Sequence, residues 1–149
     1  MDDYLVLEDL LVAQLKGTMP ELKAVMTAID LAGVKDARQV EPAAHVIYIG
    51  DDIGEGSTSQ GSNGQAQVVT QQWMVVLVVK FAGTVATGKG NRVKAGPLII
   101  KLLKALGGWQ PPNVLFRPLR RINAPKVAYQ NGFAYYPFAF KTSFVLGKS

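Results

Sequence analysis

The sequence Pro97-Leu-Ile-Ile-Lys-Leu-Leu-Lys-Ala-Leu-Gly-Gly-Trp-Gln-Pro-Pro112 predicts a helix that ends abruptly before a β-rich tail. Pro97 suits the first position of a helix, because its missing N–H would be unpaired there anyway. Gly107 can adopt the left-handed conformation that closes a helix, and the two prolines at the end prevent the helix from continuing. The apolar residues recur with helical spacing and form one continuous face: Ala95, Leu98, Ile99, Leu102, Leu103 and Leu106.

Residues 126–146 predict two strands around Asn131-Gly132, a dipeptide that favours the tight turn of a β-hairpin. Aromatic residues in the second strand alternate onto both faces, with Phe133, Tyr135, Pro137 and Ala139 on one, and Ala134, Tyr136, Phe138, Phe140 and Thr142 on the other. Aromatic side chains on two faces imply that both faces are buried, and a second subunit would supply the missing cover. The alternative is that residues 109–119 of the same chain cover the second face.

Upstream, the sequence alternates between helical and strand patterns. Residues 54–64 contain no apolar side chain and therefore predict an exposed flexible loop. The strands on either side of that loop are expected to pair antiparallel. In chain order the expected elements are a helix capped by Asp2 or Asp3 and running to about Lys16, a strand at Lys23–Ala28, a helical turn capped by Asp30, a strand at Ala43–Ile49, and a long strand at Gln65–Phe81.

The order of these elements predicts one domain over residues 1–149, of the α+β class. We expect a mainly antiparallel sheet with two main helices packed on one face and a C-terminal β-hairpin.

Composition and charge exclude several kinds of chemistry. The chain has no cysteine, so disulfides, thiolate metal sites and a cysteine nucleophile are excluded. The acidic start Met1-Asp-Asp is unlike a secretory signal, and the longest apolar run, Trp73–Val79, is too short to cross a membrane as a helix. The net charge is +5, and every charged side chain after Glu55 is positive. This asymmetry indicates either a face that meets an acidic partner or polyanion, or simply a soluble surface without such a partner.

No stretch of the sequence carries a catalytic signature. Gly83–Gly90 resembles a nucleotide-binding loop, but Gly90 stands where that loop needs Ser or Thr to hold Mg²⁺. His45 is the one histidine and lies within a strand pattern, which favours a structural role. Asp51 and Asp52 are neighbours in extended chain, so they point to opposite faces and do not form an acid–base pair. We expect no enzymatic activity, catalytic residue, cofactor or bound metal. A nucleotide-dependent enzyme is kept as a third hypothesis, after the two that are described below.

Basic residues with interleaved aromatics support a second hypothesis, a basic nucleic-acid-binding module. Arg117 and Lys126 lie near Phe116 and Tyr129, and single-strand binders combine positive grooves with stacking aromatics in this way. Most of the aromatic residues, however, have the spacing of core residues in strands, which argues against direct recognition of nucleic acid. A passage that DNA crosses without tight binding needs only the charges. The candidates for such a basic lumen or rim are Lys89, Arg92 and Lys94.

The chain resembles the bacteriophage tail terminator family over most of its length. The matching pieces are Leu10-Leu-Val-Ala-Gln-Leu15, Ala43-Ala-His-Val-Ile-Tyr48, Val69-Thr-Gln-Gln-Trp-Met-Val-Val-Leu-Val78, the helix ending in Leu106-Gly-Gly-Trp-Gln-Pro-Pro112, and the final hairpin. The resemblance implies a structural virion protein, assembled in the bacterial cytoplasm, that forms a homohexameric ring on the head-proximal end of the tail tube.

Such a ring ends tube polymerisation and offers a surface to the neck or head-completion protein. DNA is expected to pass through it without specific binding, and no membrane is involved. The residues expected at subunit or partner contacts are Trp109, Arg120, Arg121, Tyr136, Phe138 and Phe140.

Overall fold

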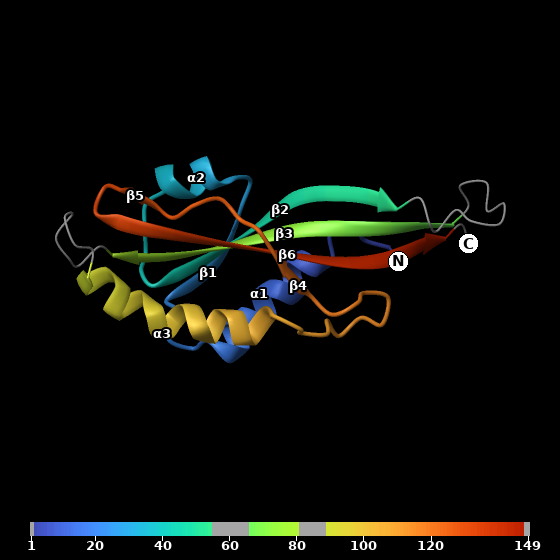
Figure 1. Ribbon diagram of the computed structural model, residues 1–149, viewed down its shortest axis with the longest axis horizontal. Coiled ribbons are helices and arrows are strands. Elements are labelled where there is room, and N and C mark those ends of the chain that lie inside the picture. The colour runs from blue at the N-terminus through green and yellow to red at the C-terminus, as the bar shows by residue number, and fades with distance from the viewer. Residues whose placement is uncertain (1, 55–65, 81–88, 148–149) are drawn as a thin grey trace.

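Two long strands, β3 (Ala66–Lys80) and β6 (Phe133–Gly147), run the length of the molecule (Figure 1). They pair antiparallel from Ala66 opposite Gly147 to Lys80 opposite Phe133. The computed structural model describes residues 2–54, 66–80 and 89–147, and its other elements are α1 (Leu7–Thr18), β1 (Ala24–Ala28), α2 (Leu31–Asp36), β2 (Ala43–Gly54), α3 (Lys89–Leu106), β4 (Arg120–Ile122) and β5 (Ala128–Gln130). The loop expected at residues 54–64 lies outside the described residues except for Gly54, and so do residues 83–88 of the nucleotide-loop resemblance.

The sheet has the strand order β1-β2-β3-β6-β4, and β5 also pairs with β6. Strands β1 and β2 are parallel, and every other pair is antiparallel. The structure thus confirms the α+β class, the antiparallel pairing of the strands that flank residues 55–65, and the extension of the sheet by the C-terminal hairpin. This mixed, mostly antiparallel sheet lacks the repeated strand–helix units of a parallel nucleotide-binding fold.

The hairpin turn confirms the prediction made from Asn131-Gly132. Both residues have a positive φ, 53° for Asn131 and 82° for Gly132. A two-residue turn of this kind matches the right-handed twist of the flanking strands, and few other residue pairs accept it. The turn therefore sets the register that places Ala128 opposite Tyr135.

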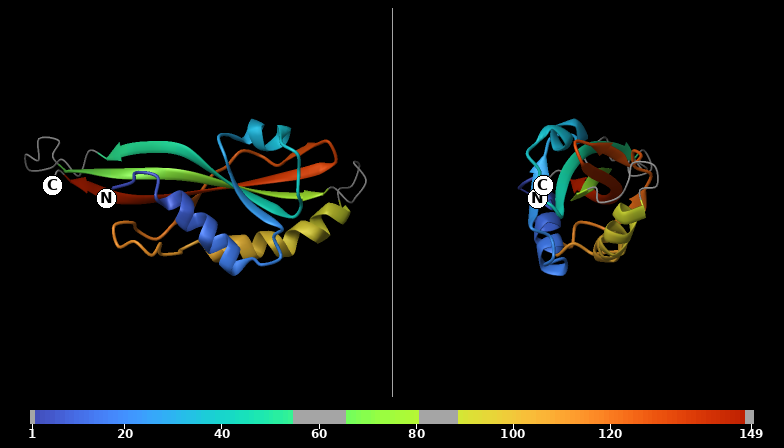
Figure 2. Two further views of the ribbon diagram at one scale, coloured as in Figure 1. Left: turned by 180° about the vertical axis from the view of Figure 1, so that it is seen from behind. Right: turned by 90° about the vertical axis from the view of Figure 1, so that its left-hand side faces the viewer.

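The two main helices cover one face of the sheet, as predicted. Figure 2 shows α1 and α3 below the sheet, on opposite flanks of the molecule. The Gln14 side chain of α1 donates a hydrogen bond to the Ala105 carbonyl of α3 at 3.0 Å. The core under these helices contains Leu7, Leu11 and Leu15 from α1, Leu102 and Leu106 from α3, and Trp73, Tyr136, Phe138 and Phe140 from the sheet.

The opposite face of the sheet is covered over half its length by α2 of the same chain. Val34 of α2 packs with Ile47, Met74, Val76, Val78 and Tyr135 in a second core. Tyr135 lies on this face and is covered by α2, so the expectation that a second subunit supplies the missing cover is wrong there. The alternative cover is wrong too, because Phe116 and Leu119 of the 109–119 segment belong to the helix-side core. We call the face that carries α2 the outer face.

The helix ends differ from the sequence predictions in three places. Helix α1 begins at Leu7, and Asp3 instead accepts a hydrogen bond from the Leu5 backbone N–H at 2.9 Å. Helix α3 begins at Lys89, so Pro97 lies inside it. The positive φ at its C-terminal end belongs to Gly108 (76°) and not to Gly107. The cap predicted at Asp30 is confirmed, because its carboxylate accepts from the Gly33 N–H at 2.7 Å.

Candidate assembly surfaces

An open groove of about 720 Å³ lies between α3 and residues 121–127. Its floor is β6, and its lining includes Arg121, Tyr136 and Phe138, three of the residues that the sequence predicts at a contact surface. The Arg121 guanidinium carbon lies 5.4 Å from the centre of the Phe138 ring, within the range of a cation–π interaction. The structure therefore brings half of the predicted contact residues together at one groove.

Strand alternation explains how this groove forms. Even-numbered side chains of β6 point toward the helices, so Tyr136 and Phe138 enter the main core and keep only 7% exposure each. Arg121 pairs in register with Phe140 and therefore shares that face. The guanidinium closes over the Phe138 ring, while Lys126 adds a second cation to the lining. The groove has an aromatic floor and a basic rim.

The other three predicted contact residues lie elsewhere. Phe140 is fully buried in the main core, so in this fold its side chain offers no surface to a partner. Trp109 is half-buried and packs against the same core. Arg120 is exposed and pairs in register with Lys141, on the outer face. Sequence pattern alone located the aromatic alternation correctly but did not show which aromatic positions α1 and α3 cover.

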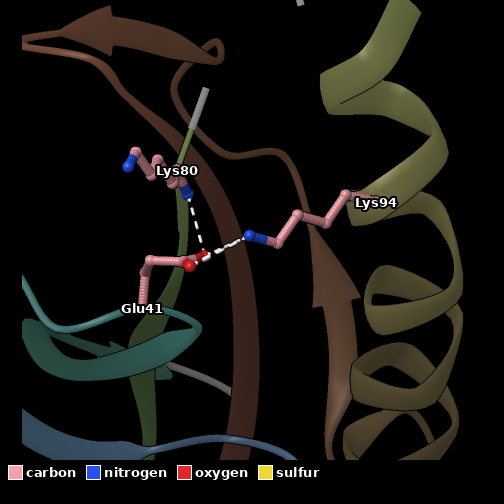
Figure 3. Close-up of polar contacts among 3 residues, drawn as sticks. All are labelled: Glu41, Lys80 and Lys94. Carbon is pink, nitrogen blue, oxygen red and sulfur yellow. Dashed lines mark hydrogen bonds and ion pairs between the residues drawn. The ribbon is translucent and has the colours of Figure 1, made fainter. Parts of the chain in front are cut away.

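Of the basic residues predicted at a lumen or rim, Lys94 has an intrachain partner. Its ammonium lies 2.7 and 2.9 Å from the two carboxylate oxygens of Glu41, which also accepts a hydrogen bond from the Lys80 backbone N–H at 3.1 Å (Figure 3). Burial raises the pKa of Glu41, but the hydrogen bonds from Lys94 and Lys80 outweigh it and hold that pKa below its usual value. Arg92 is exposed, and the side chain of Lys89 lies outside the described part of the chain.

An acidic edge that sequence reasoning did not assign lies at the C-terminal half of β2. The Asp51 carboxylate accepts a hydrogen bond from the Tyr4 hydroxyl, and Asp52 accepts one from the Gln72 side chain at 2.8 Å. Burial and the neighbouring Asp51 charge raise the pKa of Tyr4, so the phenol stays protonated. The buried Gln71 donates to the Tyr4 carbonyl at 2.7 Å and fixes the N-terminal segment over this edge. In the sequence, the signal for this edge was Gln71-Gln72, a pair of polar residues within an otherwise strand-like run.

His45 has the structural position expected of it. Its ring is buried beside an apolar hollow of about 400 Å³ between β1 and α2. Burial lowers its pKa, so the neutral form is favoured. Within residues 2–54, 66–80 and 89–147, no group of three or more His, Cys, Asp or Glu residues is placed to hold a metal ion. In the same part of the chain, no helix is long and apolar enough to span a membrane.

The chain is thus an α+β protein whose described surface carries an open groove and an acidic edge. The family model of the phage tail terminator protein matches residues 1–149, so the chain belongs to that family and is a structural protein of a phage tail. The resemblance noted in the sequence is thereby confirmed, and a structural virion component is favoured over a nucleic-acid-binding module or an enzyme.

Comparison with solved structures finds a chain of the "Virion of native gene transfer agent (GTA) particle". It is 13% identical, with a TM-score of 0.45, and the match covers 97% of this chain and 87% of that one. No curated protein sequence matches.

Proposed function

We propose that the protein forms a homohexameric ring that caps the head-proximal end of the tail tube. In this role it ends polymerisation of the tube protein and presents its far side to the neck or head-completion protein. Membership of the phage tail terminator family supports this proposal. The structural observation that carries it is that the sheet has two unlike edges, one on each flank of the subunit.

The first edge is formed by β1 and by the part of β2 that extends beyond β1, and α1 lies beneath it. The second edge is formed by β4 and β5 along β6, and α3 lies beneath that one. A contact between unlike surfaces is heterologous, and its repetition closes into a ring when the rotation divides the full circle. Unlike edges on opposite flanks suit this kind of contact.

The direct test is to measure the mass of the purified protein by native mass spectrometry and to add it to growing tail tubes. We expect a species of six copies, tubes whose elongation stops after addition, and electron micrographs with a ring at one tube end. A chain that remains monomeric at every concentration, and also on tube ends, would contradict the proposal. Tubes that keep growing with rings bound elsewhere would contradict the capping role alone.

A further inference from the structure

We propose that neighbouring copies of this chain are joined side by side by charge, with Asp51 and Asp52 of one copy against Arg117, Arg120 and Lys141 of the next. This pairing rests on the proposed ring and names the residues that close it. We call the first group the acidic edge and the second group the basic edge.

The pairing register places the two edges at the same height along the strands. Across the sheet, Gly50 lies opposite Gln72, Gln72 opposite Lys141, and Lys141 opposite Arg120. Two residues further along, Asp52 lies opposite Thr70, and Thr70 opposite Ser143. The Ser143 carbonyl accepts a hydrogen bond from the Arg117 N–H at 3.0 Å, which puts Arg117 level with Asp52.

A rotation about an axis parallel to the strands preserves these heights. It therefore brings the acidic edge of one copy to the level of the basic edge of its neighbour, without a shift along the axis. The same rotation keeps the helices of all copies on the same side of their sheets. Figure 1 shows that β2, β3 and β6 remain side by side in this half of the molecule, so the level holds across the sheet.

The charges on the two edges are segregated, and among the described residues they have no oppositely charged partner. Strand β2 contains no Lys or Arg, and residues 120–147 contain no Asp or Glu. Asp51 and Asp52 are exposed, and the donors that hold them, Tyr4 and Gln72, are both uncharged.

Among the described residues, the ion pairs of the chain involve other cations, Lys94 with Glu41 and Lys101 with Glu21. Arg117 and Arg120 are exposed and Lys141 is half-buried, and no described carboxylate lies within ion-pair distance of them. Isolated like charges along an edge repel other copies of that edge and attract the opposite one. Such complementarity sets which surfaces meet and in which register.

The test uses two charge-reversed variants. Variant A carries Asp51→Lys and Asp52→Lys, and variant B carries Arg117→Glu and Arg120→Glu. Each variant alone places like charges at every contact, so we expect the concentration needed for half-assembly to rise about tenfold or more. In an equal mixture, the reversed edge of each variant meets a complementary edge of the other. We therefore expect mixed rings with alternating A and B subunits, which native mass spectrometry resolves as three copies of each.

Controls separate the possible outcomes. A variant with Asp36→Lys and Lys104→Glu reverses exposed charges away from both edges, and it should assemble like the wild type. Circular dichroism and thermal melts check that A and B fold; if either does not, the single changes Asp52→Lys and Arg120→Glu replace them. If the wild type forms rings and variants A and B each form them alone as well, the charge pairing is overturned and the proposed ring is left intact. Loss of assembly without rescue by mixing would overturn it too, whereas a monomeric wild type would overturn the ring itself.

Discussion

At the scale of single residues, Glu41 shows how one carboxylate joins three segments. It precedes β2, accepts from the backbone at the end of β3, and pairs with Lys94 on α3 (Figure 3). The side chain of Glu41 is only 20% exposed. Because these partners lie 39 and 53 residues away in sequence, the local pattern around Lys94 suggested a free rim cation, and only the fold shows the pair.

The first prediction concerns Glu41→Gln and pH. The folded-state pKa of Glu41 is lowered from its ordinary value of 4.5. Its contribution to stability is therefore fully present above that value and is lost as the pH falls through the lower folded-state pKa. At pH 7, Glu41→Gln should lower the free energy of unfolding by about 0.5–1 kcal/mol, as expected for an ion pair near the surface.

Urea denaturation at several pH values measures this difference. The gap between wild type and variant should narrow below the ordinary pKa of the carboxyl. Glu21, which pairs with Lys101, is more exposed than Glu41, so Glu21→Gln should lower the free energy of unfolding by less. A gap that stays constant down to strongly acidic pH would contradict the assignment.

At the scale of elements, α2 determines that the second face of the sheet is covered from within the chain. Its sequence indicates only a short helical turn capped by Asp30. Its position over Tyr135 depends on the parallel pairing of β1 with β2, a contact between distant residues. The hairpin turn, the two main helices and every strand except the short β4 could be predicted because their signals are local. The cover of the outer face and the burial of Phe140 could not, because they depend on which elements pack together.

The second prediction tests this role of α2. Val34 is buried at 1% exposure, so Val34→Ala leaves a cavity in the second core and should lower the free energy of unfolding by about 1–3 kcal/mol. Ala32→Ser on the exposed side of the same helix should change it by less than about 0.5 kcal/mol. Thermal or chemical denaturation measures both variants. Equal, small effects would mean that α2 contributes little to the fold.

The third prediction concerns the end of α3. A Cβ added at Gly107 would lie 2.8 Å from the Leu103 carbonyl oxygen, which is backbone and cannot move alone. Gly107→Ala should therefore destabilise the protein by about 1 kcal/mol or more. At Gly17, in α1, an added Cβ meets nothing within 4 Å. The matched change Gly17→Ala should stabilise by about 0.5–1 kcal/mol, and opposite shifts in melting temperature are the expected result.

At the scale of the whole molecule, the two halves of the outer face differ in character. One half is apolar and lies under α2, with Ile47, Met74, Val76 and Tyr135. The other half, at the level of Gly50 and Arg120, has no helix over it in the described residues and carries Asp52, Gln72, Lys141 and Arg120. A single chain therefore presents a covered, structural half and an open, charged half.

The fourth prediction concerns DNA, which in the proposed ring passes through without being held. A conduit with many phosphate contacts would bind tightly, since each contact releases counterions and adds to the salt dependence of affinity. We expect weak binding that is independent of sequence and is lost between low and physiological salt. Arg92→Ser with Arg121→Ser, both at exposed positions outside the proposed contact between copies, should weaken the low-salt binding further, and Lys16→Ser should change it less.

Fluorescence anisotropy with two unrelated duplexes, at a series of salt concentrations, measures these affinities. The same pair of arginine changes should slow docking of the protein to its tail partner at low salt, with a smaller effect once salt screens the field. Binding that prefers one sequence and persists at high salt would instead support the nucleic-acid-binding module.

The uninterrupted pairing of β3 with β6 also has a mechanical consequence. The two strands share a ladder from Ala66 and Gly147 to Lys80 and Phe133, which extends over about 50 Å at the usual rise per residue. Antiparallel hydrogen bonds lie across the strand direction, so tension that draws β3 and β6 apart lengthwise loads every rung in shear at once. A sideways pull would instead open the rungs one after another, as a zipper does. The subunit is therefore most resistant to force along its own long axis.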